Sequence, residues 1–211
     1  MNATRTVHCG CGVAWLRERP LPPGHAVLTS LPDGSEIKRL AFDAWRAWFT
    51  DAATAVLEAL PAGSAAVFFQ TDVKRDGHQV DKGQLVHDAI ARAGARLLWH
   101  KIVLRAPAGV ATGNRPGYAH LLCASRDLRD DGPATADVLP QLGAMTWPRA
   151  IGLDAARFAV AWLRDRAAAH AIVDPFCGIG TALAVANELG LAAIGVELAP
   201  SRADKARALQ L

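Results

Sequence analysis

The sequence predicts an α/β protein built on a doubly wound, seven-stranded and mostly parallel sheet. Short apolar segments of strand length alternate with longer segments whose apolar residues recur at helical spacing, which is the order of βαβ units. One strand leads through a glycine-bearing turn, Gly178 to Gly180, into a helix, as at the ligand-binding edge of such sheets. The chain has 211 residues, of which 51% are hydrophobic and 20% charged. These values exclude a disordered chain and suit one domain over residues 1–211.

In the first half of the chain, apolar runs mark strands, and glycine and proline mark the ends of elements. Residues 65–70 form an apolar run of buried-strand length. The preceding helix, 37–60, has helical apolar spacing and ends at Pro61. Residues 95–104 and 118–125, joined by a loop with glycine and proline, are expected to form the antiparallel edge of the sheet. The expected elements of this half are strands at 6–9, 26–29, 65–70, 95–104 and 118–125 and helices at 37–60 and 84–93.

The second half repeats the alternation after a polar, turn-rich segment at 126–143. Gly190 ends one helix, and Pro200 lies in the first turn of another, where its missing N–H costs little. The expected elements of this half are helices at 147–169, 181–189 and 200–209 and strands at 171–174 and 192–197.

Charge and cysteine content set limits on partners and location. Lys and Arg number 23 against 20 Asp and Glu, and the resulting net charge of +3 allows a polyanionic partner without requiring one. The N-terminal residues lack an apolar signal core, and no apolar run reaches the roughly 20 residues of a membrane helix. We expect a cytoplasmic protein with reduced thiols and no membrane contact. Cys9 and Cys11 lack a second pair at metal-site spacing, so no metal site is expected.

The segment from Ala171 to Leu198 carries the chemistry. Gly178 and Gly180 allow a ligand to approach the backbone, and the helix that follows offers free N–H groups. Glu197 ends the next strand, where a carboxylate can accept hydrogen bonds from ribose hydroxyls. Leu183 stands where the dinucleotide fingerprint has its third glycine, so an adenosine-containing ligand other than NAD is favoured.

The run Asp174-Pro175-Phe176-Cys177-Gly178-Ile179-Gly180-Thr181, followed by a helix and Ile194-Gly195-Val196-Glu197-Leu198, resembles the S-adenosylmethionine site of the amino-group DNA methyltransferases. In one permuted branch of that family this site lies C-terminal to the catalytic half, and nearly the whole chain looks like that order. The resemblance implies a Rossmann-like class I methyltransferase fold in circularly permuted order. Its catalytic and substrate half would be residues 1–125, and its cofactor-binding half residues 145–211.

The same resemblance implies residue roles. Glu197 would bind the ribose, and Cys11 stands where relatives often have an Asp that contacts the adenine amine. Trp147 would lie beside the cofactor, either lining the pocket or packing next to it, whereas Trp45 and Trp48 are expected in the core. Cys177 is expected to be a small packing residue rather than a nucleophile. The implied cofactor-binding residues are Thr29, Trp147, Asp174, Pro175, Phe176, Cys177, Gly178, Gly180, Thr181, Glu197 and Leu198.

The catalytic motif departs from the family pattern. Thr29-Ser30-Leu31-Pro32-Asp33 stands where the family has Thr-Ser-Pro-Pro-Tyr, so the ring that stacks on a flipped base is replaced by a carboxylate. Ser30 and the Leu31 carbonyl could still accept hydrogen bonds from an acceptor amine. Asp33 could act as a general base, or the site could be unable to methylate an amine. The catalytic candidates are Ser30, Pro32 and Asp33.

Substrate contacts are expected from polar residues near the same sheet edge. Asp72 and Lys74 follow a strand there, and Arg105 and Arg115 flank a loop and could hold phosphates. Lys101 could face the substrate or extend from a strand end. Solvent exposure without a role is the alternative for each of them. The substrate candidates are Asp72, Lys74, Lys101 and Arg115.

Three functions follow from these observations. The first is an S-adenosylmethionine-dependent methyltransferase of nucleic acid. Structured RNA, tRNA in particular, is favoured over DNA because only residues 126–144 occupy the place of a target-recognition region, although a partner subunit could supply recognition. The second is a catalytically silent methyltransferase-like subunit that binds RNA or stabilises a partner. The third is a small-molecule methyltransferase, whose substrate binding would depend little on salt.

Overall fold

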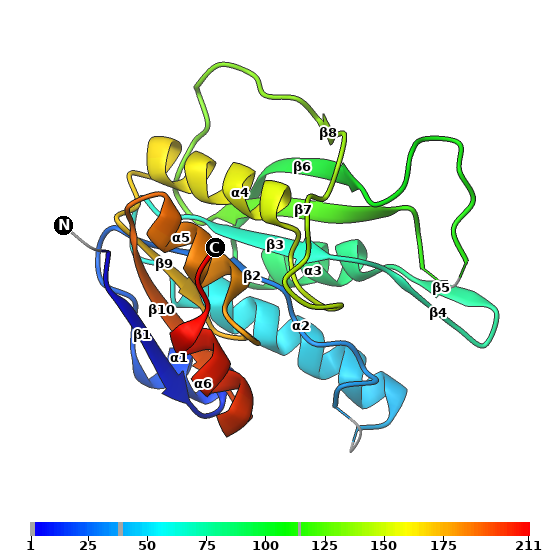
Figure 1. Cartoon of the computed structure of the whole chain (residues 1–211), viewed down its shortest axis with the longest axis horizontal. Helices are drawn as coiled ribbons and strands as arrows, with labels where there is room; N and C mark the ends of the chain where they lie inside the picture. Colours follow the sequence, from blue (N-terminus) through cyan, green and yellow to red (C-terminus); the bar gives the residue numbers. More distant parts are fainter. Residues whose placement is uncertain (1–2, 38–39, 114) are drawn as a thin grey trace.

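The computed structural model describes residues 3–37, 40–113 and 115–211, and an eight-stranded sheet runs through them (Figure 1). Its order is β1-β10-β9-β2-β3-β7-β6-β8. The first five strands in this order are parallel to one another, β7 is antiparallel to both β3 and β6, and β8 is parallel to β6. The strands are β1 (Arg5–Cys9), β2 (His25–Thr29), β3 (Ala66–Gln70), β6 (Arg96–Leu104), β7 (Tyr118–Ser125), β8 (Val138–Leu139), β9 (Ala171–Asp174) and β10 (Ala192–Glu197).

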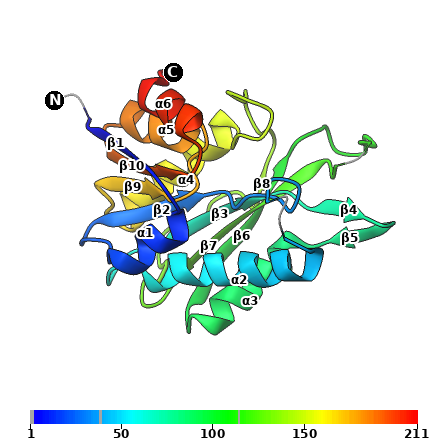
Figure 2. The same ribbon diagram turned by 90° about the horizontal axis from the view of Figure 1, so that it is seen from below.

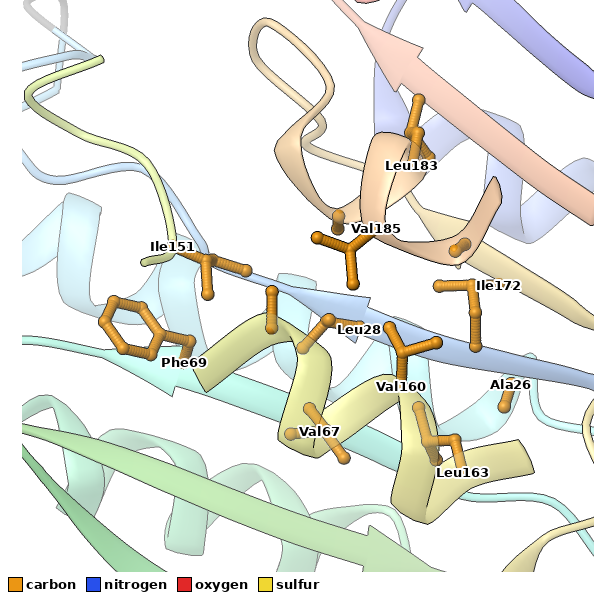
Figure 3. Close-up of a cluster of buried hydrophobic side chains, with 14 of the residues drawn as sticks. Ala26, Leu28, Val67, Phe69, Ile151, Val160, Leu163, Ile172, Leu183 and Val185 are labelled. Carbon is orange, nitrogen blue, oxygen red and sulfur yellow. The ribbon is translucent and has the colours of Figure 1, made fainter. Parts of the chain in front are cut away.

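Helices cover both faces of the sheet, as Figure 2 shows from the side. Neighbouring side chains of a strand point to opposite faces, so Ala26 and Leu28 of β2 pack in one core and Val27 in the other. In the first core (Figure 3), Leu28 and Val67 lie against Val160. The helices are α4 (Leu153–Arg166), α5 (Thr181–Glu188) and α6 (Pro200–Ala208) on that face and α1 (Gly12–Glu18), α2 (Phe42–Glu58) and α3 (Lys82–Arg92) on the other.

The predicted α/β fold with a mostly parallel sheet is confirmed, and all seven expected strands lie in the sheet. The eighth strand, β8, falls in the segment expected to be irregular; it has only two residues and therefore no detectable alternation. Because β8 pairs with β6, β6 is not the sheet edge that we expected. The seven-residue helix α1 was also missed, because it is too short for a clear period.

A hairpin replaces the loop expected after β3. Strands β4 (Val73–Arg75) and β5 (His78–Val80) pair with each other across Asp76 and Gly77. Both turn residues have positive φ, +50° and +79°, as a two-residue type I′ turn requires. The Asp-Gly pair was therefore a hairpin signal in the sequence that our interpretation did not use.

Two helices begin later than expected. The helix expected at 37–60 spans Phe42–Glu58, and residues 38 and 39 of that expectation lie outside the described residues. The helix expected at 147–169 spans Leu153–Arg166, so Trp147 does not open it. The segment before α4 folds back instead: Leu153 N–H donates to the Ala144 carbonyl, and Asp154 N–H to that of Leu142.

Among the helices of residues 3–37, 40–113 and 115–211, none is both long enough and apolar enough to cross a lipid bilayer.

Candidate cofactor and acceptor site

A cavity of about 290 Å³ opens where the parallel strands β2, β9 and β10 end. Ligands bind at this edge of open α/β sheets because loops and helix N-termini converge there. The residues expected to bind cofactor fall into two groups. Trp147, Asp174, Pro175, Phe176, Cys177, Gly178, Thr181, Glu197 and Leu198 line this cofactor cavity, together with Ser30 and Pro32, whereas Thr29 and Gly180 do not.

Asp174 is the buried acid at the end of β9. Its Oδ1 accepts both hydrogen bonds that the structure gives the carboxyl group, from Thr29 Oγ1 at 2.7 Å and from Phe176 N at 3.1 Å. Burial raises the pKa of Asp174 to about 7, although these two hydrogen bonds oppose the change. Thr29 is therefore a buried residue that positions Asp174 and does not itself line the cavity.

The raised pKa of Asp174 predicts a pH-dependent stability. The folded protein holds a proton on Asp174 that the unfolded chain has released, so this contribution to stability is full below about pH 4 and is lost as pH rises through about 7. Between pH 5 and 7 the loss is about 2 kcal/mol in the free energy of unfolding. Asp174→Asn keeps the Oδ1 acceptor and cannot ionise, so its stability should fall less over this range.

Urea unfolding of both proteins at several pH values tests this expectation. Asp165→Asn, a change at an exposed acid, is the matched control and should follow the wild type. Parallel curves for wild type and Asp174→Asn would contradict a buried, protonated Asp174.

The two glycines of the β9–α5 turn serve different contacts. Gly178 has φ +55° and lines the cavity, and a Cβ there would lie 3.2 Å from the Trp147 ring. Gly180 has φ +90°, and a Cβ there would lie 2.9 Å from Ala206 Cα. We expected both to admit the ligand; Gly180 instead allows α5 to begin against α6. Trp147 lines the cavity and also packs on the turn, so it has both of the placements that we had considered as alternatives.

Glu197 ends β10 with its carboxylate half engaged. Oε1 accepts from Ala199 N at 2.8 Å and pairs with Arg202 Nη2 at 2.9 Å. Oε2 accepts no hydrogen bond from the described residues. Leu198, the next residue, is 71% exposed at the rim of the cavity. The arrangement provides an acceptor for hydroxyl groups beside an apolar surface that can cover a flat ring.

The two cysteines of the cavity differ in environment. Burial raises the pKa of the Cys177 thiol far above its ordinary value, and the nearby Asp174 and Glu197 add to the rise. A thiol of this kind is a packing group and not a nucleophile. Cys11 is exposed and lines the cavity at the start of α1. The next residue, Gly12, lies so close to the Pro175 carbonyl that a Cβ would come within 2.0 Å of it.

A second, smaller pocket adjoins the cofactor cavity and is called the acceptor pocket here. It contains Asp33, and Ser30, Leu31, Glu36, Arg149 and Ala150 line both spaces. Apart from Thr71, the remaining side chains around it are apolar or cationic; they include Phe69, Lys82, Arg105, Arg115, Leu142 and Met145.

The catalytic candidates are held differently from one another. Asp33 forms an ion pair with Lys82, whose side chain is 4% exposed, and lies 3.8 Å from an Arg115 nitrogen. Asp33 is thus engaged by a buried ammonium group, and its role as a general base stays a prediction. The Pro32 carbonyl accepts from Trp45 Nε1 at 3.2 Å. Ser30 Oγ has no hydrogen-bond partner in the described chain, so it is the free polar group at the junction of the two spaces.

Of the four substrate candidates, only Arg115 lines either space. Asp72 is 1% exposed and accepts hydrogen bonds from Lys82 N, Gln79 Nε2 and His120 Nε2, so it anchors the start of α3. Lys101 is buried and contacts the Thr135 carbonyl and Asp137 in the segment leading to β8. Lys74 lies in the β4–β5 hairpin. Asp72, Lys74 and Lys101 thus lie outside both spaces, and their role as substrate contacts stays a prediction.

Asp72 belongs to a polar network that the sequence did not reveal. His120 Nδ1 lies 2.9 Å from His100 Nε2, and ligand atoms of Asp72, Asp81 and His120 lie within 4.8 Å of one another. Such a group could hold a divalent cation. Asp72 and Asp81 already accept backbone hydrogen bonds, from Lys82 N and Gln84 N. Because the residues come from separate segments, no spacing pattern could identify the group.

Other cavity residues were also missed. Trp45 is buried as expected, and Trp48 packs against the same core. Trp48 also lines the cavity, with its ring 6.0 Å from that of Phe176. Both tryptophans lie on α2, and the spacing of apolar residues does not distinguish a core face from a cavity face. Arg202 lines the cavity from α6 and holds Glu197.

The fold was compared with known proteins. No family profile matches the sequence, and no curated protein matches it. Among solved structures, the chain is similar to the putative DNA modification methylase TTHA0409 of Thermus thermophilus, with 20% identity, 96% of this chain and 93% of that chain covered, and a TM-score of 0.75. The chain has the fold of a methyltransferase.

Two further structures support the methyltransferase fold. The PvuII DNA methyltransferase (cytosine-N4-specific) matches with a TM-score of 0.77 at 14% identity, covering 98% of this chain and 86% of that chain. M1.HpyAVI matches with a TM-score of 0.64 at 11% identity, covering 97% and 98%. The fold expected from the resemblance to amino-group DNA methyltransferases is thus confirmed over nearly the whole chain.

These comparisons remove the reason for favouring RNA. The expectation rested on the short segment at 126–144 in place of a target-recognition region. The chain covers 93% of a protein named as a putative DNA modification methylase. The lack of a long segment at 126–144 therefore does not favour RNA over DNA.

Proposed function

We propose that the protein is an S-adenosylmethionine-dependent methyltransferase that acts on nucleic acid, with DNA as the first substrate to test. The observation that carries this proposal is the cofactor cavity, which has buried carboxyl groups at the ends of two strands and shares part of its wall, including Ser30, with the acceptor pocket. Such a pair of connected spaces suits a cofactor and a methyl acceptor that meet at one point.

The donor set fits S-adenosylmethionine. Glu197 Oε2 can accept from the ribose hydroxyls, and Asp174, in its ionised form, can balance a cationic sulfonium or ammonium group. The apolar surfaces of Trp48 and Leu198 suit the adenine ring. When bound, the cofactor would supply a methyl group on a positively charged sulfur. TTHA0409 and M1.HpyAVI have each been crystallised with this cofactor.

The chain's own residues would then orient the acceptor. Ser30 Oγ and the Leu31 carbonyl lie at the junction of the two spaces and can accept hydrogen bonds from an acceptor N–H or O–H. Holding the acceptor atom towards the methyl group supplies most of the rate in such a transfer. Nucleic acid is the proposed acceptor because the similar solved structures are named DNA methylases.

One observation favours a second candidate, a catalytically silent methyltransferase-like subunit. The residue that replaces the stacking ring, Asp33, is engaged by Lys82. A base could not stack there as on an aromatic side chain. The formed cofactor cavity opposes this alternative, because a silent subunit has no need for one.

Calorimetric titration with S-adenosylmethionine and S-adenosylhomocysteine tests the proposal first. A labelled-methyl assay on DNA, total RNA and a small-metabolite pool then identifies the acceptor. Micromolar binding with label in DNA supports the proposal; label in RNA or metabolites changes the substrate class. Binding without transfer to any pool favours the silent subunit, and no binding overturns the cofactor assignment.

A further inference from the structure

The acceptor pocket has more positive than negative side chains. Its lining includes four cationic groups, Lys82, Arg105, Arg115 and Arg149, and two carboxylates, Asp33 and Glu36. This composition is unusual for a pocket that accepts only a neutral, flat base, which would call for aromatic surfaces.

Ion pairs account for two of the four cations. Lys82 pairs with Asp33, and Arg149 pairs with Glu36 at 2.9 Å. Both carboxylates of the pocket are therefore committed to residues other than Arg105.

The positive charges of Arg105 and Arg115 are not balanced by carboxylates of their own. Arg115 has a single carboxylate contact in the pocket, Asp33 at 3.8 Å, which it shares with Lys82. Within the described ranges Arg105 has no carboxylate within 4.0 Å, and its Nη1 is buried without a hydrogen-bond partner. Burial, together with the positive charge of Arg115, lowers the pKa of Arg105.

An unpaired, partly buried guanidinium group beside a second one raises the free energy of the folded protein unless an anion binds to both groups. Guanidinium groups match the oxygens of phosphate with two parallel hydrogen bonds, which makes arginine the preferred phosphate ligand. We propose that Arg105 and Arg115 bind a phosphate group of the methyl acceptor in this pocket. The inference rests on the proposed function, since it names the part of the acceptor that this site recognises.

The position of the pocket agrees with this role. It shares Ser30 and Leu31 with the cofactor cavity, so a nucleotide held by its phosphate can direct its base or sugar towards the shared wall. The phosphate contact would then position the acceptor, while Ser30 orients the reacting group. Phosphate of a nucleic-acid strand and phosphate of a free nucleotide present the same chemistry to the two arginines.

Binding measurements without any methyl transfer test the inference. The probes are the four deoxynucleoside 5′-monophosphates, the four matching nucleosides, and single-stranded DNA and RNA decamers, titrated by calorimetry at low and moderate salt. The wild type should bind phosphate-bearing probes more tightly than nucleosides. Arg105→Gln should weaken their binding at least tenfold and leave nucleoside binding unchanged.

Arg164→Gln is the matched control, because Arg164 is exposed on α4 and pairs with its neighbour Asp165. It removes the same charge, and binding should stay within twofold of the wild type. Arg115→Gln, a change at a 43% exposed side chain, provides a second test should Arg105→Gln fold poorly. Equal losses in Arg105→Gln and Arg164→Gln, or no preference for phosphate in the wild type, would overturn the inference.

The probes also separate the two sources of phosphate. Tight binding of monophosphates identifies a free nucleotide, and tight binding of decamers alone identifies a strand. Titration with S-adenosylmethionine runs in parallel: phosphate binding without cofactor binding refutes the proposed methyltransferase but not this pocket, and the reverse result refutes only the pocket.

Discussion

Replacing Glu197 with alanine should weaken S-adenosylmethionine binding at least tenfold while the protein remains folded. Glu197 Oε1 is engaged by Ala199 N and Arg202, and Oε2 is the acceptor left for ribose hydroxyls. Loss of a charge-assisted pair of hydrogen bonds in a buried site costs a factor of roughly ten or more in affinity. Calorimetric titration gives the dissociation constant, and circular dichroism checks the fold.

Two further variants make this result specific. Glu197→Gln retains the shape and one acceptor oxygen, so its affinity should lie between those of the wild type and Glu197→Ala. Glu188→Gln changes an acid that pairs with Arg157 on the surface, and its cofactor affinity should equal the wild type's. Unchanged affinity in Glu197→Ala would show that the ribose does not bind at the end of β10.

Replacing Asp33 with alanine should destabilise the protein by about 3 kcal/mol, because it leaves the ammonium group of Lys82 buried and unpaired. The same variant should reduce turnover far more than cofactor affinity, since Asp33 lines the acceptor pocket and not the cofactor cavity. Urea unfolding measures the first effect, and the methyl-transfer assay with cofactor titration measures the second.

The double variant Asp33→Ala/Lys82→Met separates the two effects. It removes both charges, so stability should recover by most of the loss. If Asp33 acts on the acceptor, turnover stays low after this recovery; if turnover recovers with stability, Asp33 is structural. Asp51→Ala removes an acid paired with exposed Arg17 and Arg92 and should cost less than about 1 kcal/mol. A loss as small in Asp33→Ala would contradict the buried ion pair.

Local sequence signals predicted the elements that are long or sharply ended. The apolar run that became β3 and the glycine turn between β9 and α5 were recognised because each depends on neighbouring residues alone. The short elements β8 and α1 were missed because two or seven residues are too few to show a period of strand or helix. The irregular segment before α4 depends on backbone hydrogen bonds to residues about ten positions away, which no local pattern reports.

The sequence by itself determined the α/β class, the strand that ends at Asp174, the acid at Glu197 and the resemblance to methyltransferases. Each of these depends on residue type and spacing within a short stretch. Only the tertiary structure decided what the charged residues do. It joined Asp33 to Lys82, placed Lys101 away from the site, and left Arg105 without a carboxylate in the described chain. The physical reason is that an ion pair forms only where two segments that are distant in the sequence come into contact. The packing of helices on both faces of the sheet determines which segments are in contact.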